Sequence, residues 1–297
     1  TGSPSPESSA ADHERLVLEA RDVAFDWANL PFYYVPQEPL ATHVLNVLHL
    51  LLPAGEEFFV EVFKKTLPLI KDDQLRRDVQ GFIGQEAMHS QAHSGVLDHF
   101  AAQGVDVTPF TDQITWLFQK LLGEKPRRST RRQHSWLLEQ VSFIAAVEHY
   151  TAVLGEWILD SPQLDAAGAD PVMLDLFRWH GAEEVEHKAV AFDTMKHLRA
   201  GYWRRARTAL AVAPVMPLLW IRGVRFLYSV DPYLPSGTKP RWRDYVGAAR
   251  RGLVPGPLRL MRVVTSHFEP GFHPSQLGGL GLAVDYLAVS PAARASH

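Results

Sequence analysis

Residues 179–193 are WHGAEEVEHKAVAFD, and residues 82–93 are FIGQEAMHSQAH. Both stretches contain the spacing Glu-x-x-His, as Glu184 with His187 and as Glu86 with His89. Residues three apart lie on the same face of an α-helix. In both segments this pair falls among the apolar positions of the expected helix, so we expect buried carboxylates and imidazoles.

Two further expected helices each place one glutamate on an apolar face. Glu56 lies on that face of a helix expected over 53–67, and Glu148 on that of a helix over 130–159. A buried carboxylate is costly unless it is paired or bound to a metal ion. A lone Glu, a Glu-x-x-His, a lone Glu and a second Glu-x-x-His form the ligand set of ferritin-like di-iron and di-manganese bundles. The sequence therefore predicts an all-α fold, a ferritin-like four-helix bundle with additional C-terminal helices.

Two more histidines lie one helical turn from these motifs. His93 follows His89, and His180 precedes Glu184. Because the two helices would run in opposite directions, both histidines should point toward the same end of the bundle and approach each other. They would bind a third metal ion, support the ligands or line a substrate pocket, and we take them as the catalytic candidates. Glu183 could replace or join Glu184. The candidate metal-site residues are Glu56, Glu86, His89, His93, Glu148, His180, Glu183, Glu184 and His187.

The composition restricts the metal chemistry. The 297 residues include no cysteine, which excludes disulfides, thiolate zinc sites and iron–sulfur clusters. Nitrogen and oxygen donors suit iron, and we expect two or three iron ions per chain, with manganese or zinc as alternatives. The formal net charge of −3 gives no indication of nucleic-acid binding.

The chain divides into three parts on these expectations. Residues 1–30 form a partly disordered leader, 31–201 the metal-binding bundle, and 202–297 a helical appendage packed on it. Expected helices cover 41–52, 53–67, 73–102, 109–122, 130–159, 171–199, 202–229 and 240–265. The longest apolar run, 209–221, has thirteen residues and two prolines, too short to span a membrane. We expect a cytoplasmic protein without a transmembrane segment; peripheral membrane contact and a homodimer are compatible with the sequence.

The chain also resembles a bacterial family of predicted metal-dependent hydrolases. The similar stretches are PAGEEFF (53–59), FIGQEAMHSQAH (82–93), EHYTA (148–152), WHGAEEVEHKAVAFD (179–193) and EPGFHP (269–274). The resemblance extends over roughly 30–275 and implies metal dependence at the nine candidate residues.

Three functions fit these features. We favour a non-haem di-iron oxidase or oxygenase, in which carboxylate-bridged iron activates O₂ against an organic substrate. The alternative is a metal-dependent hydrolase that uses a metal-activated water. Metal storage or sensing is the third hypothesis. The aromatic content and the apolar run 209–221 favour a small apolar or lipid-like substrate.

Overall fold

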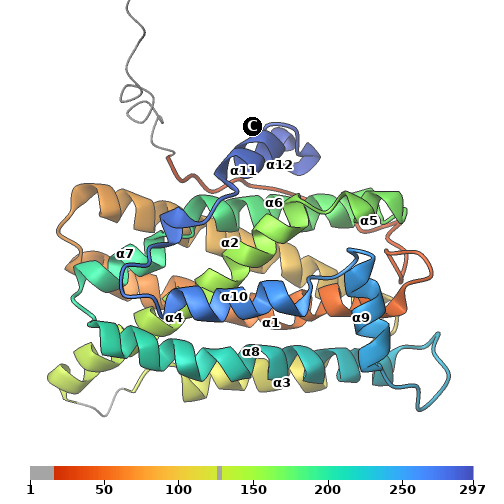
Figure 1. The fold of residues 1–297 in the computed structure, drawn as a ribbon, viewed down its shortest axis with the longest axis horizontal. Helices are drawn as coiled ribbons and strands as arrows, with labels where there is room; N and C mark the ends of the chain where they lie inside the picture. The colour runs from red at the N-terminus through yellow and green to blue at the C-terminus, as the bar shows by residue number, and fades with distance from the viewer. Residues whose placement is uncertain (1–16, 126–128, 297) are drawn as a thin grey trace, which may run out of the picture.

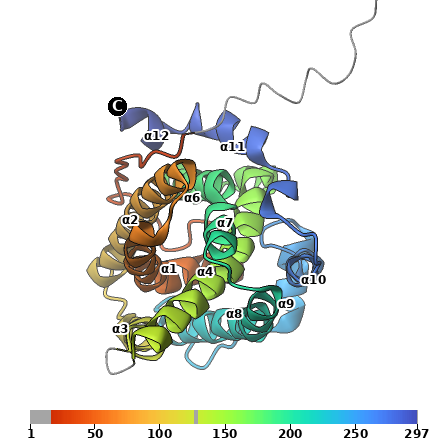
Figure 2. The ribbon, with the colours of Figure 1, turned by 90° about the vertical axis from the view of Figure 1, so that its left-hand side faces the viewer.

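Within residues 17–125 and 129–296, which the computed structural model describes, every regular element is a helix. The predicted all-α fold is therefore confirmed. Four long helices, α1 (Pro39–Thr66), α2 (Asp73–Ala102), α4 (Thr130–Leu159) and α6 (Pro171–His187), form the central bundle (Figures 1 and 2). The main packing pairs are α1 with α2 and α4 with α6.

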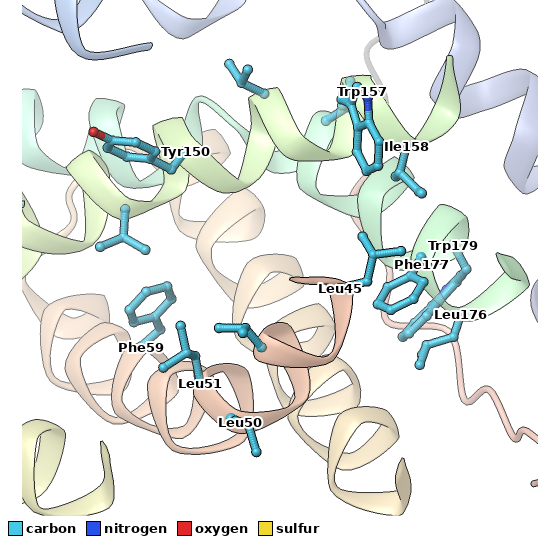
Figure 3. Packing of buried hydrophobic residues seen from close by; sticks show 14 of the residues in the cluster. Leu45, Leu50, Leu51, Phe59, Tyr150, Trp157, Ile158, Leu176, Phe177 and Trp179 are labelled. Carbon is cyan, nitrogen blue, oxygen red and sulfur yellow. The ribbon is translucent and has the colours of Figure 1, made fainter. Parts of the chain in front are cut away.

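Apolar side chains from the inner faces of these helices fill the bundle. Figure 3 shows Leu45 and Leu51 of α1, Ile158 of α4 and Phe177 of α6 among them, all buried. The same inner faces carry the glutamates and histidines of the two motifs, so the packing that stabilises the bundle also positions these polar groups.

Two glycines allow α4 and α6 to approach closely. A Cβ atom on Gly155 would lie 2.4 Å from the carbonyl oxygen of Gly181, and one on Gly181 would lie 2.9 Å from the Cα atom of Gly155. Any larger residue would push the helices apart. Glu148 lies two turns from Gly155 and Glu184 one turn from Gly181, so this contact sets the spacing between these two glutamates.

Three predicted helix boundaries were wrong. Pro53 does not begin a new helix but lies inside α1, where burial against α2 outweighs the lost backbone hydrogen bond. The helix expected over 171–199 is divided into α6 and α7 (Val190–His197), and the Lys188 ammonium between them donates to the carbonyl oxygens of Leu277 and Gly278. The helix expected over 240–265 is divided into α9 (Trp242–Arg250) and α10 (Pro257–His267), because Gly252 adopts a φ of +77° between them.

The remaining elements surround the bundle. They are η1 (Leu67–Leu69), α3 (Thr108–Trp116), η2 (Leu117–Leu121), α5 (Pro162–Ala166), α8 (Tyr202–Val230), η3 (Pro274–Gln276), α11 (Leu280–Leu287) and α12 (Pro291–Ala295). The long helix α8 packs along α1 and α4, whereas α11 and α12 pack on α6 at the opposite side of the bundle (Figures 1 and 2). Asp175 of α6 fixes this C-terminal pair, because its carboxylate accepts hydrogen bonds from the hydroxyls of Tyr286 and Ser290, both at 2.7 Å.

The segment before α1 packs on the bundle without regular structure. Of the expected leader, residues 1–16 lie outside the described residues. From Val17 onward the chain lies against α2, where a Cβ atom on Gly81 would fall 2.3 Å from the carbonyl oxygen of Leu18. Val23 and Leu30 are buried in the core. The second half of the expected leader therefore belongs to the fold.

Candidate metal centre

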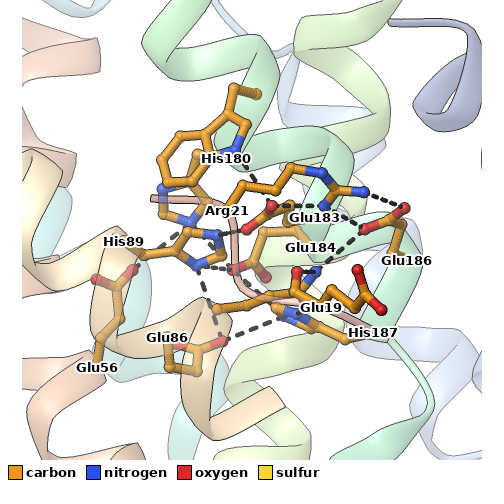
Figure 4. A network of polar contacts seen from close by, with 12 residues as sticks. Glu19, Arg21, Glu56, Glu86, His89, His180, Glu183, Glu184, Glu186 and His187 are labelled. Atoms are coloured by element: carbon orange, nitrogen blue, oxygen red, sulfur yellow. Dashed lines mark hydrogen bonds and ion pairs between the residues drawn. The ribbon is translucent and has the colours of Figure 1, made fainter. Parts of the chain in front are cut away.

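The nine candidate residues come together inside the bundle, and each is at most 6% exposed. Figure 4 shows seven of them with their polar contacts. Glu56 comes from α1, Glu86, His89 and His93 from α2, Glu148 from α4, and His180, Glu183, Glu184 and His187 from α6. All of them are buried, as helical periodicity predicts for residues on or beside the apolar stripe of a helix.

Seven of these residues form two groups of four that share one member. In each group the ligand atoms lie within 4.8 Å of one another. The first group is Glu56, His89, His180 and Glu184, and the second is Glu86, Glu148, Glu184 and His187. Glu184 belongs to both, so its carboxylate lies between two positions that could each hold a metal ion.

The distances show how tightly the donors converge. In the second group, His187 Nε2 lies 3.2 Å from oxygens of both Glu86 and Glu148. In the first group, His180 Nε2 lies 3.0 Å from Glu184 Oε1 and 3.5 Å from Glu56 Oε1. Each histidine thus points a ring nitrogen at two carboxylates, as ligands around one cation do.

Several of these buried atoms have no hydrogen-bond partner in the part of the chain that the structure describes. They include both carboxylate oxygens of Glu56 and of Glu86, and the Nδ1 atom of His89. Leaving buried polar atoms unsatisfied is expensive, and for ionised groups the cost is larger still. A divalent cation in each group would bind these atoms, so the residues fit a two-metal centre.

The acid–base properties of the cluster agree with this fit. Burial, followed by repulsion from the other carboxylates, raises the pKa of Glu56 and Glu86 well above the usual range and that of Glu148 to about 7. Burial opposes ionisation of Glu184 too, but His187 and His180 hold its pKa well below the usual value. Without cations, the protein therefore tends to keep protons on Glu56 and Glu86 and a negative charge on Glu184.

The residue before each Glu-x-x-His motif orients the histidine of the other motif. Glu183 Oε2 lies 3.0 Å from His89 Nε2, and Gln85 Oε1 lies 3.0 Å from His187 Nδ1. In both rings the other nitrogen faces the carboxylate groups. Such outer hydrogen bonds fix the orientation of metal-binding imidazoles. Glu183 therefore does not replace Glu184 as a member of the two groups.

Arg21 forms ion pairs with Glu183, which orients His89, and with the nearby Glu186. Its guanidinium donates to Glu183 Oε1 at 2.6 Å and to Glu186 Oε2 at 3.0 Å, and Trp179 Nε1 also donates to Glu183, at 3.2 Å (Figure 4). Arg21 could not be predicted from the sequence, because it lies in an irregular segment without helical periodicity. Gln85 was not predicted either, although its position before Glu86 matches that of Glu183 before Glu184.

A chain of three histidines leads away from the first group. His93 Nε2 lies 2.6 Å from His180 Nδ1, and His93 Nδ1 lies 2.7 Å from His49 Nδ1. The approach of His93 to His180 agrees with the expectation from opposed helices. His180 itself lies among the ligand atoms of the first group, not apart from the metal pair, whereas His93 belongs to neither group. His49 was not among the predicted site residues, although it lies two turns before Glu56 on the same face of α1.

A narrow apolar cavity of about 50 Å³ adjoins the centre. Glu184 and His180 are among its lining residues, and Thr151 adds a hydroxyl. The rest of the wall is almost entirely apolar, and its members include Leu45, Leu48, Trp157, Ile158, Phe177 and Trp220. Four of these, Leu45, Trp157, Ile158 and Phe177, are seen in Figure 3. The cavity suits a slender apolar group.

A family model described as a predicted metal-dependent hydrolase matches residues 19–278. The searches of curated proteins and of solved structures each gave no match. The family description agrees with the hydrolase alternative of the sequence analysis better than with the oxidase that we favoured there. The matched range contains every residue of the two ligand groups.

Proposed function

We propose that this chain, which belongs to the family of predicted metal-dependent hydrolases, hydrolyses a small apolar substrate at a centre of two divalent metal ions. The observation that carries this proposal is the position of Glu184, which belongs to both four-residue groups. A carboxylate in that position can bridge two cations. A two-metal hydrolase requires such a pair of neighbouring cations.

The donor atoms divide naturally between the two ions. Glu56, His89 and His180 would hold one, Glu86, Glu148 and His187 the other, and Glu184 both. Oxygen and nitrogen donors of this kind suit zinc, manganese or iron. When bound, such a pair lowers the pKa of a water molecule and polarises the bond that the water attacks.

The protein's own side chains prepare the site in three ways. Glu183 and Gln85 hold the imidazoles of His89 and His187 in fixed orientations. His93 contacts the Nδ1 atom of His180, the side of the ring that faces away from Glu184, and so restrains His180. The apolar wall beside His180 excludes bulk water and favours an apolar group next to the reacting bond.

A second candidate function is an O₂-dependent di-iron oxidase, and the donor set is the observation that favours it. Glutamate with Glu-x-x-His pairs on four helices is the ligand pattern of ferritin-like di-iron proteins. No cysteine is present that an oxidant could damage. Metal storage or sensing is favoured less, because neither needs the apolar cavity beside Glu184.

Metal content and oxygen dependence together separate these functions. The protein is purified anaerobically after growth with iron, manganese and zinc, its metals are measured, and it is assayed against ester and amide libraries with and without O₂. We expect about two metal ions per chain and hydrolysis that needs no O₂. The control is Glu184→Gln, which should lose both metal and activity. Two irons with a new near-ultraviolet absorption band on adding O₂, and no hydrolysis, would instead establish the oxidase.

A further inference from the structure

Helix α8 has an apolar outer face that no other part of the described chain covers. Trp203 is 82% exposed, Leu210 66% and Leu218 55%. These residues are seven and eight positions apart, which places them along one side of the helix, and Ile221 continues the row at 46% exposure. A row of large exposed apolar side chains is unusual on a soluble protein and indicates an interaction surface.

The inner face of α8 is firmly attached to the bundle. Trp220 Nε1 donates to the carbonyl oxygen of Val44 at 2.9 Å, and the Thr208 hydroxyl lies 3.3 Å from the carbonyl oxygen of Ser142. Three residues after Trp220, Gly223 lies so close to Val47 that a Cβ atom on this glycine would fall 2.9 Å from the Val47 side chain. These contacts keep α8 flat along α1 and α4 (Figure 1).

This attachment decides how α8 could meet a lipid bilayer. By length and composition alone its 29 residues could cross a membrane, unlike the thirteen-residue run considered from the sequence. Crossing would require α8 to leave the bundle and lose its buried contacts. Lying in the membrane surface requires no rearrangement, because the apolar face already points outward.

The charges on α8 favour an anionic surface. The helix has five arginines and no acidic residue, and its segment 209–221 carries no charge. Arg204 and Arg207, at one end, share an ion pair with Glu139. Arg222 and Arg225, at the other end, are exposed; Arg222 donates to Gln113 of α3, and Arg225 has no acidic partner within the described residues. An apolar stretch with arginines at both ends is typical of helices that lie in the interface of anionic bilayers.

The same helix also lines the cavity beside the candidate metal centre. Trp220 forms part of that wall together with Glu184 and His180. Leu218 and Ile221, two positions before and one position after Trp220, are exposed on the outer face. The exposed apolar face and a part of the cavity wall therefore belong to the same helix.

We propose that the outer face of α8 docks on an anionic lipid membrane, and that the substrate of the centre is an apolar, lipid-like molecule supplied by that membrane. The docking stands on the exposed face and its charges alone. The second part rests on the proposed function, since it names the substrate class of the same site.

Site-directed fluorescence tests the docking without any activity assay. Because the chain has no cysteine, Leu218→Cys gives a single position for an environment-sensitive dye. The metal-loaded, labelled protein is mixed with vesicles of phosphatidylglycerol and phosphatidylcholine, or of phosphatidylcholine alone. We expect a blue shift and an intensity gain of several-fold with the anionic vesicles only. The matched control is Val289→Cys, also highly exposed but at the opposite side of the bundle near α11.

Charge and apolar substitutions on unlabelled protein give the second measurement. Leu218→Glu with Ile221→Glu should reduce co-sedimentation with anionic vesicles at least tenfold, and Arg225→Glu about fivefold at low salt. Leu282→Glu with Val289→Glu, near α11, should leave it unchanged. Metal content equal to that of the unaltered chain shows that each variant is folded.

Two results would overturn the docking. One is that the emission spectrum of the dye on the Leu218→Cys variant does not change when anionic vesicles are added. The other is a dimer in sedimentation velocity that the Leu218 and Ile221 substitutions dissociate, because a second copy would then cover the face. If the protein docks on anionic vesicles but hydrolyses no lipid-like ester, the docking of α8 stands and the proposed hydrolase function is wrong.

Discussion

Glu183 and Glu184 are neighbours in the chain, yet they lie on opposite sides of the same imidazole. Glu183 Oε2 is 3.0 Å from His89 Nε2, whereas Glu184 Oε1 is 3.6 Å from His89 Nδ1. The ring of His89 thus separates a carboxylate that orients it from a carboxylate that shares its ligand group. This geometry assigns different tasks to two residues that the sequence could not distinguish.

Replacement of Glu183 should weaken metal binding without removing a metal position. In Glu183→Ala the imidazole of His89 loses its orienting hydrogen bond, which typically costs about 10–100-fold in metal affinity. Glu183→Gln should lose less, because an amide oxygen still accepts a hydrogen bond. Competition with a chelator gives the affinities, and elemental analysis at saturation should still give the full metal content. A lower content at saturation would make Glu183 a ligand itself.

Glu184 and Glu148 should differ in how many ions their loss removes. Glu184 belongs to both ligand groups and Glu148 to the second alone. We therefore expect Glu184→Ala to lose both ions and Glu148→Ala to lose one, as measured by elemental analysis of protein with unchanged helix content. If Glu148→Ala retains both ions and full activity, the assignment of ligands from four helices is wrong.

His180 is the residue for which sequence and structure lead to opposite expectations. From the sequence it lies one turn outside the motif, so His180→Ala should spare the metal pair. In the structure its Nε2 atom lies in the group of Glu56, His89 and Glu184, so the variant should lose one ion. His93→Ala is the matched control, because His93 contacts His180 but belongs to neither group. Elemental analysis of the two variants decides between the expectations.

Helical periodicity explains why most of the centre could be predicted. Each candidate residue lies on a long helix with a clear apolar stripe, so the direction of its side chain follows from spacing alone. The same argument fails for Arg21, whose segment has no repeating pattern and is positioned only by tertiary contacts with Glu183 and Glu186.

Pairing across helices also lies beyond what the spacing can show. The sequence predicts that Gln85 and His187 lie on two different helices. It does not show that Gln85 Oε1 lies 3.0 Å from His187 Nδ1, because that distance depends on how the helices pack. For the fold, one error came from a proline, because a local rule begins a new helix at Pro53 where packing against α2 keeps α1 continuous. At Pro53, burial against α2 therefore outweighs the local preference of proline for the start of a helix.

Loss of Arg21 should destabilise the protein. Its guanidinium lies between the nearly inaccessible side chains of Glu183 and Glu186, and removing it leaves two buried acidic groups without their cation. Breaking a buried ion pair on one side typically costs about 3–5 kcal/mol, and the partial exposure of Arg21 favours the lower end. Urea unfolding of Arg21→Met should show a loss of about 3 kcal/mol.

A second substitution tests that explanation. Adding Glu186→Gln to Arg21→Met removes one of the unpaired acids, so part of the lost stability should return. Equal stability of the single and double variants would mean that Arg21 acts through packing and not through charge.

His267 should make the protein sensitive to acid. The residue is 2% exposed, neither ring nitrogen has a hydrogen-bond partner within the described residues, and burial, with smaller effects of His149 and Arg205, lowers its pKa to about 3. The unfolded chain binds this proton near pH 6.5, and the folded chain does so only near pH 3. The contribution of neutral His267 to the free energy of unfolding is therefore fully present above about pH 6.5. It is lost as the pH falls from 6.5 toward 3, because the unfolded chain takes up the proton first.

The variant His267→Phe removes this titration while keeping a ring among Phe192 and Phe272. Relative to the unaltered chain, its free energy of unfolding should rise by up to about 1.4 kcal/mol for each pH unit below 6.5. Urea titrations at several pH values between 7.5 and 5, in the same metal state, measure this difference, in which the shared contributions of the metal ligands cancel. His134→Phe, at an exposed position of α4, is the matched control because its side chain meets water in both states. Parallel pH profiles for His267→Phe and the unaltered chain would show that this buried imidazole contributes nothing to acid unfolding.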